Sequence, residues 1–148
     1  MIQPVHEIQR RVEFYETDMA GIVHFSNFFR YMESCEHAFI RSLGHELHGL
    51  IDEVETGWPR VHASCDYRAP AHFGDLLDIR LFIEEIRPRS IRYLFHIVCE
   101  DTLVAEGRLI TTHVALTPDG IKAVALPAAL REKLRVLSPE TPQPDHEK

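Results

Sequence analysis

Asp18 is the residue whose surroundings in the sequence best suit acid–base or nucleophilic chemistry. It begins the short segment 18–25, between a strand predicted to end near Glu16 and a helix predicted to begin at Ser26. The N-terminus of a helix presents unpaired amide hydrogens and the positive end of the helix dipole, so a carbonyl held there would be polarised. A carboxylate on the preceding loop can attack that carbonyl or activate a water molecule beside it. The alternative is that Asp18 caps a turn or the helix.

Two other features of the sequence suit substrate binding. Gly21 would let the backbone approach a substrate with no side chain in between. Arg87, Arg89 and Ser90 lie on one predicted turn. Two guanidinium groups beside a hydroxyl suit a phosphate, although an ordinary solvated turn can have the same composition.

The predicted elements place these residues in an α+β domain. A loose alternation predicts a first strand at residues 6–16, and apolar residues at steps of three and four predict a helix from Ser26, capped by Ser26 or Asn27 and ending at Gly44. After an irregular connection at 45–59, alternation predicts strands near 60–68, 77–84, 91–99 and 103–116, then a short helix at 127–137. This order predicts one long helix lying across a curved antiparallel sheet. We interpret 1–137 as a single domain and the proline-rich segment 138–148 as a disordered tail.

Composition argues against several classes of protein. The 148 residues carry a formal net charge of −7, which disfavours binding to nucleic acid or an anionic membrane. No stretch approaches the ~20 apolar residues of a membrane-spanning helix. Cys35, Cys65 and Cys99 have no CxxC spacing, which predicts free thiols and a cytoplasmic location. His45 and His48 are too close for the HExxH zinc motif, and we expect neither a metal nor another cofactor.

The string EFYETDMAGIVHFSNFFRYME at residues 13–33 resembles the signature of the 4-hydroxybenzoyl-CoA thioesterase family. The resemblance implies the hotdog fold, in which an antiparallel sheet wraps one long helix, and an assembly of dimers that often pair into tetramers. It implies that Asp18 acts as the nucleophile or general base. It also implies that the backbone amide of Phe25 binds the thioester oxygen. His24 departs from the aromatic residue usual at its position, and it either adds a polar contact near the acyl group or fills the aromatic slot.

The resemblance also bears on the candidate binding residues. The turn with Arg87, Arg89 and Ser90 resembles the place where these thioesterases hold the phosphates of coenzyme A. The strand with His62 and Ser64 is implied to lie near the acyl pocket of the neighbouring subunit, although ordinary strand polarity also explains these two residues.

The sequence therefore predicts an acyl-CoA thioesterase that works as a homo-oligomer, a dimer or a dimer of dimers. A sheet covered by one helix leaves an edge open, and Phe82 and Leu94 lie on otherwise polar strand faces, which also predicts association. The alternative function is a hotdog protein that binds acyl-CoA or acyl carrier protein without hydrolysis. The acyl group, and whether Asp18 forms a covalent intermediate or activates water, stay open at this stage.

Overall fold

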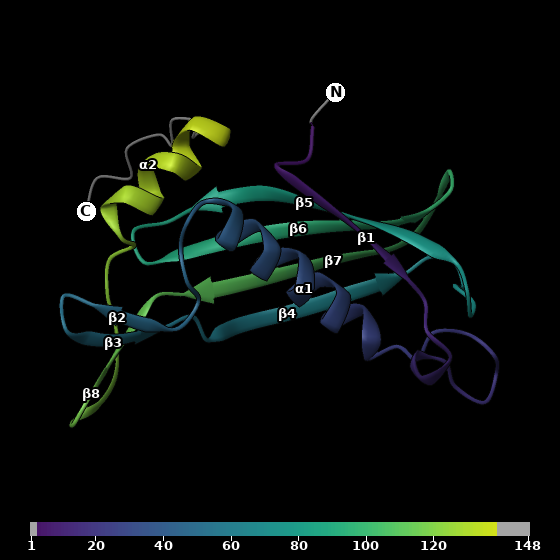
Figure 1. Ribbon diagram of the computed structural model, residues 1–148, viewed down its shortest axis with the longest axis horizontal. Coiled ribbons are helices and arrows are strands. Elements are labelled where there is room, and N and C mark those ends of the chain that lie inside the picture. Colours follow the sequence, from purple (N-terminus) through teal and green to yellow (C-terminus); the bar gives the residue numbers. More distant parts are fainter. Residues whose placement is uncertain (1–2, 139–148) are drawn as a thin grey trace.

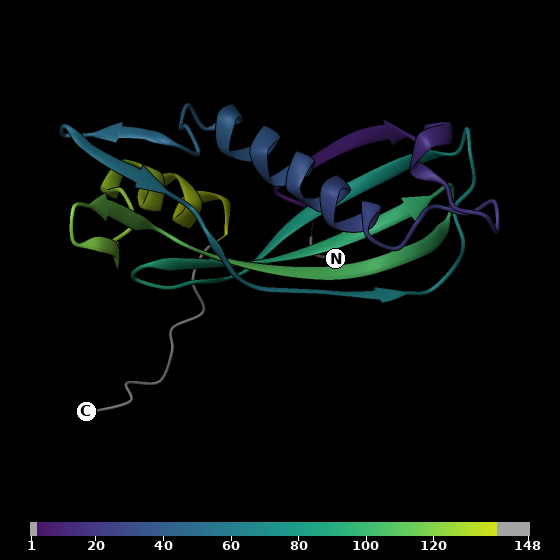
Figure 2. The same cartoon turned by 90° about the horizontal axis from the view of Figure 1, so that it is seen from below.

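The computed structural model describes residues 3–138. Its main layer is a five-stranded antiparallel sheet in the order β1-β5-β6-β7-β4, and α1 lies along one face of this sheet (Figure 1). Figure 2 shows the sheet curving beneath α1, as the predicted α+β hotdog arrangement requires. The elements of this layer are β1 (His6–Arg11), α1 (Asn27–Ser42), β4 (Arg60–Tyr67), β5 (Leu76–Ile86), β6 (Ser90–Cys99) and β7 (Thr102–Thr112).

The helix α1 packs through the apolar face that its periodicity predicts. Phe28, Tyr31, Met32, Cys35 and Phe39 are all buried against the sheet. The closest approach is at Gly107 of β7, where a Cβ atom would overlap the Met32 sulfur. Glycine at this position therefore allows the helix to lie close to the sheet.

The two ends of α1 differ in how well they were predicted. Gly44 has φ +79°, the left-handed conformation expected just after a helix. The predicted side-chain cap at the other end is wrong, because neither Ser26 nor Asn27 caps the helix. The Asn27 side chain instead donates a hydrogen bond to the Glu16 carbonyl at 2.7 Å, and the Ser26 hydroxyl lies 2.7 Å from Nδ1 of His24.

The predicted first strand is too long. It ends at Arg11, and residues Phe14–Glu16 form a turn of 3₁₀ helix. In this turn Glu13 and Glu16 form a capping box, in which the Glu16 side chain accepts a hydrogen bond from the Glu13 amide. Such a local side-chain hydrogen bond competes with strand geometry.

The structure also has a second sheet, which contradicts the expectation of a single one. Its order is β2-β3-β8-β9, formed by β2 (Gly49–Ile51), β3 (Val54–Gly57), β8 (Val114–Thr117) and β9 (Gly120–Ala123). The connection at 45–59 is therefore a hairpin, turned by Asp52 and Glu53 at positive φ. The long strand predicted at 103–116 breaks at His113, whose Nδ1 hydrogen-bonds to the Ala125 carbonyl and whose ring packs on Trp58.

The predicted C-terminal helix is confirmed as α2 (Ala128–Leu137), which buries Leu130 and Leu134. The predicted tail lies outside the described residues except for Ser138, whose amide donates to the Leu134 carbonyl. Within residues 3–138, no helix has the length and apolar character needed to cross a membrane. Cys35, Cys65 and Cys99 are free thiols, as predicted.

Candidate active site

Asp18 lies at the start of a tight turn between β1 and α1. Thr17 and Val23 form an antiparallel bridge, and the Asp18 amide donates to the Ile22 carbonyl at 2.9 Å. The Gly21 amide returns to the Asp18 carbonyl at 3.0 Å, and Gly21 has φ +79°. A residue with a side chain would be strained there, so the turn itself requires glycine at this position.

The carboxylate of Asp18 is only partly engaged. Its Oδ1 accepts a hydrogen bond from the Ala20 amide at 2.8 Å, so Asp18 does stabilise its own turn. The other oxygen makes no hydrogen bond or ion pair with any residue from 3 to 138. One oxygen thus fixes the orientation of the carboxylate, and the other is available for chemistry.

Phe25 precedes α1 by two residues, and its amide donates to no backbone carbonyl within the described chain. Its ring is 62% exposed and stacks on His24, with 4.5 Å between the ring centroids. Nδ1 of His24 accepts a hydrogen bond from the Ser26 amide at 3.3 Å. The imidazole therefore packs as an aromatic ring and also holds the first turn before the helix.

Asp18 and Phe25 line the same cavity, of about 370 Å³. Its other walls are mainly apolar and come from Ile22, Val23, Phe28 and the segment Tyr67, Arg68, Ala69, Pro70 and Ala71. Gly21 and His24 do not line it. The structure thus places Asp18, which carries a carboxylate, and Phe25, whose amide donates to no backbone carbonyl in the described chain, beside one largely apolar cavity.

Two residues of this cavity were missed from the sequence. The Tyr67 hydroxyl donates a hydrogen bond to the Phe25 carbonyl at 3.0 Å and so holds the backbone two residues before α1. Arg68 and Asp18 are the charged residues of the lining, and the Arg68 guanidinium makes a long contact of 3.9 Å to Asp66. Tyr67 lies 42 positions from Phe25 in the chain, and no local pattern connects the two.

The predicted phosphate-binding turn lies far from Asp18 within one chain. Arg87, Arg89 and Ser90 join β5 to β6 next to α2, whereas the Asp18 turn adjoins the start of β5, where Ile22 pairs with His72 (Figure 1). The 11 residues of β5 separate these places, which amounts to roughly 30 Å at the usual rise of a strand. Arg87 is also held by Glu85 at 3.0 Å, and this hydrogen bond raises its pKa.

His62 and Ser64 lie outside the cavity as well. Their side chains contact one another at 3.2 Å on β4. Ser64 pairs with Arg108, in the row of side chains that continues to Leu94 and Phe82. This row is on the outer face of the sheet, away from α1. One chain alone therefore does not bring His62 or Ser64 to Asp18.

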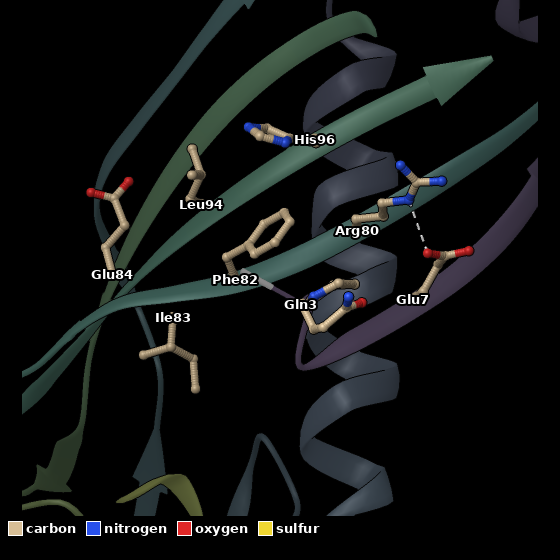
Figure 3. Close-up of a pocket in the computed structure, with 9 residues that line it drawn as sticks. Gln3, Glu7, Arg80, Phe82, Ile83, Glu84, Leu94 and His96 are labelled. Atoms are coloured by element: carbon tan, nitrogen blue, oxygen red, sulfur yellow. Dashed lines mark hydrogen bonds and ion pairs between the residues drawn. The ribbon is translucent and has the colours of Figure 1, made fainter. Parts of the chain in front are cut away.

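The outer face carries a larger hollow, of about 770 Å³, between β1, β5 and β6. Phe82 and Leu94, the two residues from which association was predicted, line this hollow (Figure 3). Polar contacts surround them, among them the ion pair of Arg80 with Glu7 at 3.0 Å and the contact of His96 with Glu106 at 3.1 Å. The hollow contains neither Asp18 nor a helix terminus, so it lacks the features that carbonyl chemistry needs.

A buried ion pair joins α1 to β4. Glu36 is 1% exposed, and its Oε1 accepts a hydrogen bond from Arg60 at 3.1 Å. Its other oxygen has no hydrogen-bond partner within residues 3–138. Burial raises the pKa of Glu36 to about 7, against the opposing effect of the Arg60 charge. Glu36 does not line the cavity at Asp18 and serves the packing of the helix.

Comparisons with known proteins agree over most of the chain. The family model described as the thioesterase-like superfamily matches residues 12–134. A putative esterase from Aquifex aeolicus (strain VF5) is 35% identical over 130 residues, which cover 86% of this chain and 95% of that protein. A 1,4-dihydroxy-2-naphthoyl-CoA hydrolase from Synechococcus sp. (strain CC9605) is 34% identical over 134 residues, which cover 84% of this chain and 85% of that protein.

Solved structures give the same result. A 1,4-dihydroxy-2-naphthoyl-CoA thioesterase from Synechocystis superimposes with a TM-score of 0.77 at 28% identity, over 85% of this chain and 92% of that one. A gentisyl-coenzyme A thioesterase superimposes with a TM-score of 0.75 at 30% identity, over 84% of this chain and 98% of that one.

Proposed function

The chain belongs to the thioesterase-like superfamily, and we propose that it hydrolyses acyl-CoA thioesters with Asp18 and the Phe25 amide as its catalytic groups. The predicted resemblance is confirmed at the level of this superfamily and its hotdog fold. The observation that supports the proposal is the cavity that Asp18 and Phe25 both line, together with the Asp18 oxygen and the Phe25 amide that have no hydrogen-bond partner within residues 3–138.

The geometry supports the following reaction. The thioester carbonyl oxygen points at the Phe25 amide and the N-terminus of α1, which stabilise the negative charge that develops on it. The Asp18 carboxylate then either attacks the carbonyl carbon or takes a proton from a water molecule that attacks it. Both routes break the carbon–sulfur bond and release the CoA thiolate. In the first route a mixed anhydride forms on Asp18, and water hydrolyses it to the free acid.

We propose that the acyl group is aromatic. The cavity presents the rings of Phe25, Phe28 and Tyr67, with Phe28 and Tyr67 in edge-to-face contact at 5.4 Å. Aromatic rings favour an aromatic ligand packed edge-to-face or offset against them. Two relatives are named for the aromatic CoA thioesters 1,4-dihydroxy-2-naphthoyl-CoA and gentisyl-CoA.

The coenzyme then requires a second copy of the chain. Arg87 and Arg89 are too far from Asp18 to serve the site of their own chain, but β4 is an edge strand with exposed Val61 and Tyr67. Pairing of β4 with β4 of another copy, in antiparallel fashion, would place the β5–β6 turn of one copy near the Asp18 end of the other. Exposed Phe14 and Phe73 beside the Asp18 turn also favour coverage at this end.

A thiol-release assay tests the function. Benzoyl-CoA, gentisyl-CoA and hexanoyl-CoA should all be offered, and the aromatic esters should be hydrolysed with the highest kcat/KM. Binding of these esters without thiol release would instead support the alternative, a protein that binds acyl-CoA or acyl carrier protein without hydrolysis. A preference for hexanoyl-CoA would contradict the aromatic acyl group and leave the hydrolytic function standing.

A further inference from the structure

Glu16 is a buried acidic residue two positions before Asp18, and the reaction proposed above does not use it. It is 3% exposed. Both of its carboxylate oxygens are engaged: Oε1 accepts the Glu13 amide at 2.8 Å, and Oε2 accepts Nη2 of Arg10 at 2.8 Å. Such a carboxylate holds its neighbours more firmly than a surface ion pair does, because removing Arg10 would leave the buried Glu16 oxygen unsatisfied.

The backbone carbonyl of Glu16 is engaged as well, on the other side of the turn. It accepts hydrogen bonds from the Asn27 side chain at 2.7 Å and from the His24 amide at 2.9 Å. His24 directly precedes Phe25, and Asn27 is the first residue of α1. The carbonyl of Glu16 therefore ties the N-terminus of the helix to the chain that leads into Asp18.

Together these contacts join four segments at one residue. Arg10 belongs to β1, Glu13 directly precedes the 3₁₀ turn, His24 lies near the end of the Asp18 loop and Asn27 opens α1. Arg10 is itself fixed, because its guanidinium lies over the Tyr31 ring of α1, 5.4 Å from the ring centroid. Burial, and then the negative charge of Glu16, raise the pKa of Tyr31.

We propose that Glu16 is a positioning residue, whose side chain and carbonyl set the distance between the Asp18 carboxylate and the Phe25 amide. The inference rests on the function proposed above. The Asp18 turn and the Thr17–Val23 bridge shape the loop itself, and Tyr67 holds Phe25. The bonds to the Glu16 side chain and carbonyl add the connection from this loop to β1 and to the first residue of α1. Hydrolysis needs both groups at one carbonyl, and a shift of about 1 Å can cost about 100-fold in rate.

Glu16→Gln tests the proposal. The amide keeps the shape and one acceptor but presents an NH₂ group, or a neutral oxygen, to Arg10. We expect kcat for gentisyl-CoA to fall roughly 10- to 100-fold. The affinity for a non-hydrolysable thioether analogue of the same ester should stay within about threefold, because ground-state binding depends little on the spacing of the two catalytic groups.

Glu7→Gln is the matched control. Glu7 of β1 also forms an ion pair with an arginine, Arg80 of β5, at 3.0 Å, but this pair lies on the outer face of the sheet (Figure 3). This variant should keep the wild-type kcat. If Glu16→Gln does not fold, Asn27→Ala removes the hydrogen bond from α1 to the Glu16 carbonyl while leaving the Glu16 side chain and its partners in place. It carries the same expectation of a lower kcat with analogue affinity retained.

The outcomes separate a positioning role from a structural one. A structural role would lower the melting temperature of Glu16→Gln and leave kcat of the folded enzyme unchanged, which would overturn the proposal. Loss of analogue affinity in proportion to kcat, or an equal loss of kcat in Glu7→Gln, would overturn it too. Asp18→Asn is measured in parallel: if it keeps wild-type turnover, the proposed function fails. If Asp18→Asn is inactive and Glu16→Gln has wild-type kcat, only the role of Glu16 is refuted.

Discussion

Mixing two variants that each release little thiol at low substrate concentration should restore activity if each site draws on two copies of the chain. One variant is Asp18→Asn, and the other carries Arg87→Ala and Arg89→Ala. Within one chain these residues are separated by the 11 residues of β5, roughly 30 Å at 3.3 Å per residue. A clamp on the coenzyme of the same chain would therefore have to act across nearly the whole length of the sheet.

The size of the effect follows from the pairing of the copies. A site formed by a chain with intact Asp18 and a partner with intact arginines is complete. Random pairing of equal amounts gives about a quarter of all sites this composition, so thiol release at low substrate concentration should reach about a quarter of the wild-type rate. The two variants are co-expressed, or unfolded and refolded together, and compared with each variant alone. A mixture that gives only the average of the two separate rates would refute a site shared between copies.

Three further predictions follow from the described contacts. Arg87→Ala with Arg89→Ala should raise KM for CoA thioesters far more than it lowers kcat. KM for the same acyl group on N-acetylcysteamine, which lacks the nucleotide, should not change. An equal loss of kcat/KM for both substrates would contradict a phosphate clamp. Gly107→Ala should lower the free energy of unfolding in urea by roughly 1–3 kcal/mol, because the new methyl group overlaps buried Met32; unchanged stability would contradict the close approach of α1. The pKa of Glu36 in the folded protein, about 7, lies above its ordinary 4.5, so the stability that Glu36 contributes is complete below pH 4.5 and is lost as the pH rises through 7. In urea titrations, the free energy of unfolding of Glu36→Gln should therefore increase relative to that of wild type by roughly 1–3 kcal/mol between pH 4.5 and 8. A difference that stays constant across this range would show that Glu36 ionises normally.

The elements in which apolar residues recur at a regular spacing could be predicted from the sequence. The helical face with Phe28 and Phe39, and the alternation in β5 and β6, recur at fixed steps because one side of each element faces the core. The place of Asp18 and Phe25 beside one cavity agrees with what the family resemblance of residues 13–33 implied.

The parts that depend on contacts between distant segments could not be predicted. The break between β7 and β8 at His113 is stabilised by its hydrogen bond to the Ala125 carbonyl and by its packing on the Trp58 ring. The alternation of apolar and polar residues along a strand does not indicate either contact. The missing cap at Asn27 has the same origin, since the Glu16 carbonyl takes its side chain. Tyr67 enters the site from a strand 42 positions away from Phe25. Each of these is a single polar contact between segments that are distant in the chain, so it produces no periodic pattern in the sequence.

Asp18→Asn tests the central claim most directly. The substitution keeps the acceptor for the Ala20 amide and removes the charge, so the turn should persist and the fold should remain intact. Thiol release from gentisyl-CoA by this variant, with a thioether analogue as the measure of binding, gives the result. We predict a loss in kcat of about 10²–10⁴-fold, with analogue affinity close to wild type. A well-folded Asp18→Asn protein that releases thiol at a rate close to wild type would contradict the account.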